Sequence, residues 1–168
     1  MNPGKMHPIV VMGVSGSGKS TIGRALALRM RARFIEGDEY HPPANIAKMS
    51  QGTPLNDEDR WPWLETLRGE LAESVRRGEP VILSCSALRQ AYRDRLGLGL
   101  PGITWIYLKG EREALLRNFA KRSDHFMKAN MLDSQLRTLE EPVDAIVLPC
   151  EGPVDELVDR AIRSMHEA

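Results

Sequence analysis

Short apolar runs alternate with longer amphipathic stretches along the 168 residues of this chain. The apolar runs are rich in β-branched residues, and each is followed by a turn signal or a polar residue, which is typical of strands. This alternation indicates a parallel sheet covered by helices on both faces, so the predicted fold class is α/β. The five predicted strands are Ile9–Met12, Arg33–Glu36, Pro80–Ser84, Thr104–Leu108 and Ala145–Leu148.

Two of the amphipathic stretches carry a clear helical stripe. A long helix is predicted to begin near Asn56-Asp57, because acidic residues suit the positive end of a helix dipole, and Gly78 can end it. The last helix repeats apolar residues from Val154 to Met165, and we expect it to pack in the core. The stripe of the long helix consists of Trp61, Leu64, Leu67, Leu71 and Val75.

Residues 13–20 have the spacing of a phosphate-binding loop and follow directly after the first predicted strand. Backbone N–H groups at a helix N-terminus hold a polyphosphate, and the glycines of the loop let the backbone approach the phosphates closely. Lys19 is predicted to reach the β- and γ-phosphates of ATP, and Ser20 to offer its hydroxyl to Mg²⁺. The predicted ATP-binding residues are Gly13, Val14, Ser15, Gly16, Ser17, Gly18, Lys19, Ser20 and Thr21.

Length and charge restrict the class of protein that carries this phosphate loop. A chain of 168 residues fits one domain, here 1–168. Lys and Arg number 23, as do Asp and Glu, so the sequence lacks the basic excess of a nucleic-acid or anionic-membrane binder. The apolar runs are strand-sized and the first eight residues are polar, so we expect no membrane segment and a location in the cytoplasm. Cys85 and Cys150 are predicted to be buried free thiols.

Two segments fit the regular alternation poorly, and function is expected to concentrate there: Gly37–Trp63 and Lys121–Leu132. Ligands of open parallel sheets lie outside the carboxyl ends of the strands, so Asp38 should face the same crevice as the phosphate loop. Asp38 is therefore a candidate base that accepts the proton of an acceptor hydroxyl during phosphoryl transfer. A helix cap or a carboxylate near the metal is the alternative role for Asp38.

The chain resembles the thermoresistant type of gluconate kinases, which are small P-loop enzymes related in fold to shikimate and adenylate kinases. The resemblance covers nearly the whole chain, and the block from Asp38 to Leu64 together with Cys85–Leu88 is specific to this family. The matching residues are Met12–Ser20, Gly37-Asp38, His41-Pro42, Asn45-Ile46, Lys48-Met49, Gly52, Pro54-Leu55, Asp57, Asp59-Arg60, Pro62–Leu64, Cys85–Leu88, Tyr92–Asp94, Tyr107–Gly110, His125-Phe126 and Thr138–Glu140.

The resemblance implies transfer of the γ-phosphoryl group of ATP to the 6-hydroxyl of D-gluconate. It also implies a three-layer α/β/α fold with strand order 2-3-1-4-5, and relatives are often homodimers. The family pattern puts Asp38 beside the acceptor hydroxyl, and it places His41, Lys48, Arg60 and the turn Ser86–Arg89 around the sugar acid.

The substrate carboxylate favours an arginine, because a planar guanidinium pairs with both carboxylate oxygens. Arg60 or Arg89 is the natural anchor, whereas hydroxyl groups along gluconate need short polar partners such as His41 and Ser86. Salt bridges to the nearby Asp57 and Asp59 are the alternative for Arg60.

Residues 121–132 correspond to the lid of this kinase class, which closes on ATP and excludes water. Arg122 is the lid candidate for contact with the transferring phosphate, as a third catalytic residue beside Lys19 and Asp38. His125 is a further candidate for substrate binding, with a structural hydrogen bond as the alternative. The chain departs from its relatives at Asp124, where a Gly is usual, and at Asn118, where an Arg is common.

Other classes of phosphate-loop protein fit less well. A GTPase would need an Asn-Lys-x-Asp stretch to read guanine, and the sequence has none. A nucleoside-monophosphate kinase is the nearest rival, since an arginine cluster could bind a nucleotide phosphate instead of a carboxylate. A regulator that binds ATP without catalysis is the alternative outside enzymology, and Asp38 with Arg122 argues against it.

Overall fold

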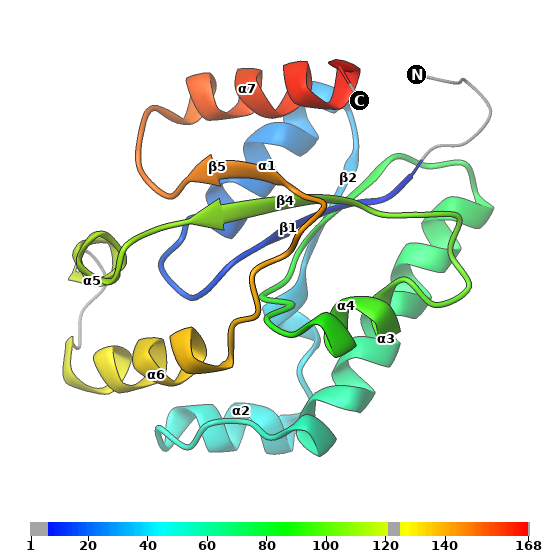
Figure 1. Cartoon of the computed structure of the whole chain (residues 1–168). Helices are drawn as coiled ribbons and strands as arrows, with labels where there is room; N and C mark the ends of the chain where they lie inside the picture. The colour runs from blue at the N-terminus through cyan, green and yellow to red at the C-terminus, as the bar shows by residue number, and fades with distance from the viewer. Residues whose placement is uncertain (1–6, 121–124, 168) are drawn as a thin grey trace.

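The computed structural model describes residues 7–120 and 125–167, which form a five-stranded parallel sheet between two helical layers (Figure 1). The order of the strands is β2-β3-β1-β4-β5, which confirms the order that the resemblance implied. Every strand agrees with its prediction to within one residue at each end. The strands are β1 (Ile9–Met12), β2 (Arg33–Glu36), β3 (Val81–Ser84), β4 (Thr104–Lys109) and β5 (Ile146–Pro149).

The helices follow the strands in the alternation that the apolar pattern predicted. The long predicted helix begins at Asp57, and the Asn56 side chain accepts a hydrogen bond from the backbone N–H of Asp59 while the Asp59 carboxylate accepts one from Asn56. This reciprocal capping box fixes the start of the helix. The helices are α1 (Lys19–Met30), α2 (Pro43–Ser50), α3 (Asp57–Arg76), α4 (Gln90–Leu96), α5 (Arg112–Ala120), α6 (His125–Thr138) and α7 (Val154–Glu167).

One face of the sheet is covered by α1 and α7 (Figure 1). Successive side chains of a strand point to opposite faces, so Ile9 and Val11 of β1 lie in this layer. They pack with Leu26 of α1 and with Val158 of α7, which are almost wholly buried. The last helix therefore serves core packing, as predicted from its stripe.

The opposite face is covered by α3 and α4, with α6 further along the same side (Figure 1). Val10 and Met12 of β1 point into this layer. The layer also buries the stripe of α3, from Leu64 to Leu71, together with Tyr92 of α4. Because both faces of the central strands are buried, β1 and β3 read as nearly continuous apolar runs, whereas the edge strand β2 carries a charged residue at each end.

Three strands end at the same level and so bring three loops together. Val11 of β1 pairs with Ser84 of β3, and Ser84 pairs in turn with Glu36 of β2. The phosphate loop follows β1, a single 3-10 turn called η1 (Gly37–Tyr40) follows β2, and the turn at Ser86 follows β3. The topology therefore gathers these three segments at one edge of the sheet.

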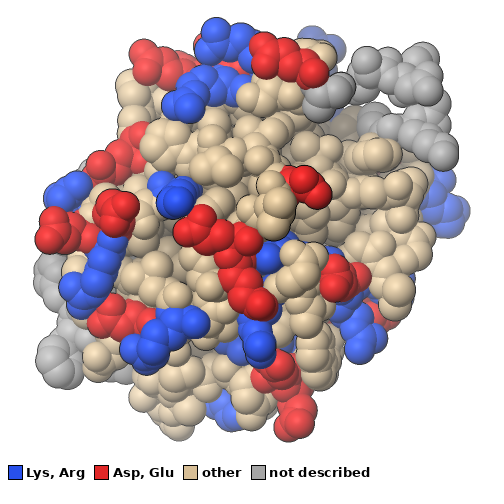
Figure 2. Space-filling view, in the orientation of Figure 1, with Lys and Arg blue, Asp and Glu red and all other residues tan. Residues whose placement is uncertain are grey.

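The surface charges are mixed, as the balanced composition predicts, and the two cysteines differ in burial. On the face shown in Figure 2, Lys and Arg side chains are interspersed with Asp and Glu. Cys85 and Cys150 are free, but only Cys85 is buried as predicted, whereas Cys150 is half-buried. Burial raises the pKa of the Cys85 thiol to about 12, so that thiol stays protonated. None of the helices that the structure describes is long and apolar enough to cross a membrane.

Candidate active site

The phosphate loop wraps around the N-terminus of α1. Gly18 has φ of 93° and serves as the N-cap of α1, and Gly16 has φ of 82°. Both values lie in the left-handed region, which glycine adopts without strain. An added Cβ at Gly13 would lie 2.7 Å from the Ser17 hydroxyl oxygen, so this position leaves no room for a side chain. The loop thus presents backbone N–H groups at a helix N-terminus, which fits a polyphosphate.

Two side chains of α1 extend the loop toward the site. The Lys19 ammonium donates a hydrogen bond of 3.0 Å to the carbonyl oxygen of Val14. The Ser20 hydroxyl donates to a carboxylate oxygen of Glu36, the last residue of β2. Our sequence reasoning missed Glu36, although it ends a predicted strand. A hydroxyl beside a carboxylate is a set of oxygen donors that suits Mg²⁺.

A cavity of about 200 Å³ opens next to the loop. Six predicted site residues share it, contributed by the phosphate loop, by the segments after β2 and β3 and by α3, which closes one side. The cavity is lined by Ser15, Lys19, Asp38, His41, Met49, Pro54, Leu55, Arg60, Trp63, Ser86, Leu88, Met131, Ser134 and Gln135.

Asp38 reaches this cavity because β2 turns sharply into η1. A Cβ at Gly37 would collide with the carbonyl oxygen of Ser84, so only glycine lets η1 lie this close to β3. The carbonyl of Gly37 also accepts a 2.8 Å hydrogen bond from the indole of Trp63. Asp38 and Lys19 therefore line the same cavity from two different loops.

His41 is buried against a fixed partner on each side. Its ring stacks on Trp63, with 4.1 Å between the ring centroids. The Asn45 amide nitrogen lies 3.2 Å from His41 Nδ1 and also donates to the carbonyl of Asp59. An amide nitrogen only donates, so Nδ1 accepts and the proton of the neutral ring sits on Nε2. Burial lowers the pKa of His41, which favours this neutral form.

Arg60 lies both at the cavity and beside Asp57, and its role as the anchor of a substrate carboxylate stays a prediction. It lines the cavity, and one guanidinium nitrogen lies 3.8 Å from the Asp57 carboxylate. The same nitrogen donates a 3.0 Å hydrogen bond to the Tyr92 hydroxyl, which in turn donates to Asp57. Burial and then this bond to Asp57 raise the pKa of Tyr92, so the phenol remains a donor at neutral pH. Asp57 and Tyr92 thus orient the Arg60 side chain.

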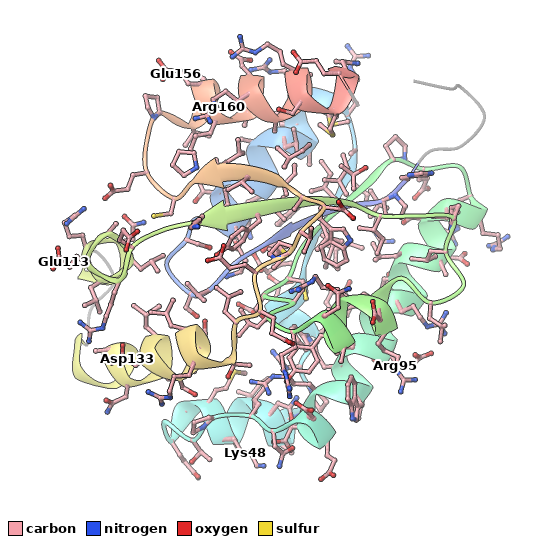
Figure 3. All side chains as sticks on the ribbon, viewed as in Figure 1. Lys48, Arg95, Glu113, Asp133, Glu156 and Arg160 are labelled. Carbon is pink, nitrogen blue, oxygen red and sulfur yellow. The ribbon has the colours of Figure 1, made fainter. Side chains whose placement is uncertain are left out.

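The other predicted substrate contacts differ in position. Ser86 lines the cavity, but Lys48 and Arg89 are not among the described residues of the lining. Lys48 lies on α2, the helix lowest in Figure 3, and its ammonium is 2.7 Å from Asp59. Arg89 is the N-cap of α4 and lies 3.3 Å from Asp57. Substrate contacts by these two residues stay predictions.

Helices α5 and α6 each contact the phosphate loop. Asn118 of α5 donates a 2.7 Å hydrogen bond to the carbonyl of Gly16, so the residue that departs from the family pattern here holds the loop. Gln135 of α6 bonds Ser15 twice, at 2.7 and 2.8 Å. We had not predicted a role for Gln135, because nothing in the local pattern marks it.

The predicted lid lies partly outside the described residues. Arg122 is not described, and no side-chain position is described for His125, so both roles stay predictions. Residues 125–132 of the predicted lid form the first part of α6, and Arg112 of α5 is paired with Asp133 of α6 at 2.6 Å. Asp133 is labelled on α6 in Figure 3.

A family model described as "AAA domain" matches residues 9–142. The thermoresistant gluconokinase of Escherichia coli (strain K12) is 41% identical over 160 residues, which cover 93% of this chain and 91% of that protein. The gluconokinase of Gluconobacter oxydans (strain 621H) is 47% identical over 137 residues, covering 81% and 76% of the two chains.

Solved structures of kinases are also similar to this chain. The crystal structure of a gluconokinase from Sinorhizobium meliloti 1021 superposes with a TM-score of 0.87 at 44% identity, covering 96% of this chain and 93% of that one. A shikimate kinase from Aquifex aeolicus superposes with a TM-score of 0.56 at 18% identity, which shows a shared fold alone. With its phosphate loop, its strand order and these relatives, the chain belongs to the gluconokinase family of P-loop kinases.

Proposed function

We propose that this protein transfers the γ-phosphoryl group of ATP to the 6-hydroxyl of D-gluconate, giving 6-phospho-D-gluconate and ADP. The observation that carries the proposal is the cavity in which Lys19, Asp38 and Arg60 meet beside the phosphate loop. Lys19 suits a phosphate, Asp38 suits a hydroxyl group and Arg60 suits a carboxylate. Gluconokinase relatives that cover most of the chain favour gluconate as the acceptor.

The donor side is formed by the loop and by Lys19. Backbone N–H groups from Gly16 to Ser20 hold the phosphates at the N-terminus of α1. The Lys19 ammonium, now at the Val14 carbonyl, moves to the β- and γ-phosphates and neutralises charge that develops there.

The acceptor side uses three kinds of partner. Arg60 pairs with the substrate carboxylate, while Ser86 and His41 Nε2 bond the hydroxyl groups along the sugar acid. Asp38 aligns the 6-hydroxyl and accepts its proton as the oxygen–phosphorus bond forms. The bond between the γ-phosphorus and its bridging oxygen breaks, and ADP leaves.

Mg²⁺ fits beside this site, because the Ser20 hydroxyl and the Glu36 carboxylate face each other. Bound there with ATP, the ion would supply positive charge to the phosphate oxygens. Glu36, and not Asp38, is the carboxylate that lies next to the Ser20 hydroxyl. The carboxylate of Asp38 therefore remains available to the acceptor hydroxyl.

The test is a coupled assay of ADP release with Mg-ATP and a panel of gluconate, other sugar acids, shikimate and AMP, with the product mass confirmed. Stimulation by gluconate alone supports the proposal. Stimulation by AMP would favour the nucleoside-monophosphate kinase alternative, and slow hydrolysis without any acceptor effect would favour an ATP-binding regulator.

Two further expectations from the sequence belong to the proposal. We propose a homodimer, which light scattering coupled to size-exclusion chromatography measures directly. We also propose that the enzyme acts in the cytoplasm, which fractionation of cells that express the protein would test.

A further inference from the structure

The carboxamide of Gln135 makes a two-point contact with Ser15 of the phosphate loop. Its Oε1 accepts a 2.7 Å hydrogen bond from the backbone N–H of Ser15, and its Nε2 donates a 2.8 Å bond to the Ser15 hydroxyl. A backbone N–H only donates, so the orientation of the carboxamide is fixed by the chemistry of its partner. The two residues are 120 positions apart in the chain.

Ser15 occupies the part of the loop that faces the acceptor. The cavity is lined by Ser15 and Lys19 of the loop, whereas Gly16, Ser17 and Gly18 lie outside its described lining. The acceptor residue Asp38 lines the same cavity. Since the phosphoryl group passes from the loop to the acceptor, its path runs past Ser15, where Gln135 also lines the cavity.

Resting on the proposed function, we infer that Gln135 contacts the terminal phosphate of ATP. A carboxamide has two donor hydrogens and two acceptor lone pairs, and the bonds to Ser15 use one of each. The second N–H of Nε2 can donate to a γ-phosphate oxygen, which is a charge-assisted bond. Ser15 holds the carboxamide in place, so the donor is oriented before ATP arrives.

A purely structural role for Gln135 is less consistent with its surroundings. Helix α6 has its own anchors, since Leu132 is fully buried in the core and Asp133 pairs with Arg112. Loss of the Gln135 amide therefore leaves α6 packed. The polar contact lies on the cavity side, where it serves the ligand.

The experiment measures binding of a non-hydrolysable ATP analogue and of ADP, each with Mg²⁺ and without acceptor, by calorimetry. Gln135→Met keeps the length of the side chain and removes its donor. We expect the dissociation constant of the ATP analogue to rise about tenfold while that of ADP changes less than twofold, because ADP lacks the terminal phosphate. Gln51→Met, at an exposed position outside the cavity lining, is the matched control and should change neither value.

A second variant keeps the inference testable if Gln135→Met fails to fold. Gln135→Glu retains an acceptor for the Ser15 N–H but places a negative charge where the terminal phosphate lies. It should therefore weaken binding of the ATP analogue more than binding of ADP. Equal weakening of both nucleotides, or unchanged binding of both, would overturn the inference. Because no acceptor is present, the result is independent of whether gluconate is the substrate.

Discussion

At the scale of single residues, Asp38 is the proposed base that accepts the proton of the acceptor hydroxyl. Asp38→Asn keeps the size and polarity of the side chain but removes the base, so kcat with gluconate should fall by roughly 10²-fold or more. The dissociation constant of ATP should stay nearly unchanged, because Asp38 belongs to the segment after β2 and not to the phosphate loop. Steady-state kinetics and nucleotide calorimetry measure the two quantities. The control is Glu39→Gln, which removes the charge of the neighbouring carboxylate on η1 and should retain full turnover. Unchanged turnover in Asp38→Asn would exclude the assignment of Asp38 as the base.

His41 gives the folded protein a pH dependence whose direction follows from burial. Burial lowers the pKa of His41 below its ordinary value of 6.5, with Asp38 raising it and Arg60 lowering it in smaller measure. Between the lowered pKa and 6.5 the unfolded chain binds the proton and the folded chain does not, so the stabilisation present above pH 6.5 is lost as the pH falls.

The free energy of unfolding should therefore decrease from about pH 7 to about pH 5. In His41→Asn that decrease should be smaller, as urea titrations at several pH values would show. His166→Asn, which changes an exposed histidine of α7, should keep the decrease of the unchanged protein. Identical pH profiles for His41→Asn and the unchanged protein would contradict a neutral buried ring.

At the scale of elements, α3 and α4 meet at the side of the cavity where the acceptor is proposed to bind. The Tyr92 hydroxyl of α4 accepts a hydrogen bond from Arg60 of α3, and the Arg60 guanidinium also lies over the Tyr92 ring, 5.2 Å from its centroid. Tyr92 is almost fully buried and does not line the cavity among the described residues, so its effect on the acceptor passes through Arg60.

Tyr92→Phe should consequently raise the KM for gluconate by about tenfold, because Arg60 loses the hydroxyl that orients it. The KM for ATP should change less than twofold, since the phosphate loop is untouched. Kinetics with each substrate varied in turn separate the two effects. The control is Tyr107→Phe, which removes a hydroxyl from a buried tyrosine of β4 and should leave both KM values unchanged. Equal rises in both KM values for Tyr92→Phe would indicate a general loss of structure and contradict the prediction.

The elements could be read from the sequence because their signals are local. Apolar runs gave all five strands, and the Asn56-Asp57 signal gave the start of α3. Contacts between distant residues have no such local signal. Glu36 meets Ser20 across 16 positions, Asn118 meets Gly16 across 102, and both contacts depend on how the loops gather at the sheet edge. Asp38 could be predicted to lie at the cavity because it follows a predicted strand, and His41 because the family resemblance includes it, whereas Gln135 lies within helix α6 without such a signal.

At the scale of the whole molecule, the phosphate loop ties the layers together. It joins β1 to α1, accepts a bond from Asn118 of α5 and is held by Gln135 of α6. The N–H of Gly13 also lies 3.4 Å from the carbonyl oxygen of Ser86, on the turn that follows β3. A ligand that binds this loop in the folded state alone stabilises every element attached to it, because binding to the native state shifts the folding equilibrium.

Saturation with Mg-ATP analogue should accordingly raise the melting temperature. At a ligand concentration of about 100 times the dissociation constant, the stabilisation is about 2.7 kcal/mol, which corresponds to roughly 5–10 °C for a domain of this size. Differential scanning calorimetry measures the shift. Lys19→Ala should melt near the unchanged protein without ligand yet gain clearly less from the same ligand concentration, because the β- and γ-phosphates lose their cation. An equal shift in Lys19→Ala would mean that the nucleotide stabilises the fold from somewhere other than the phosphate loop, and the assignment of the donor site would then be wrong.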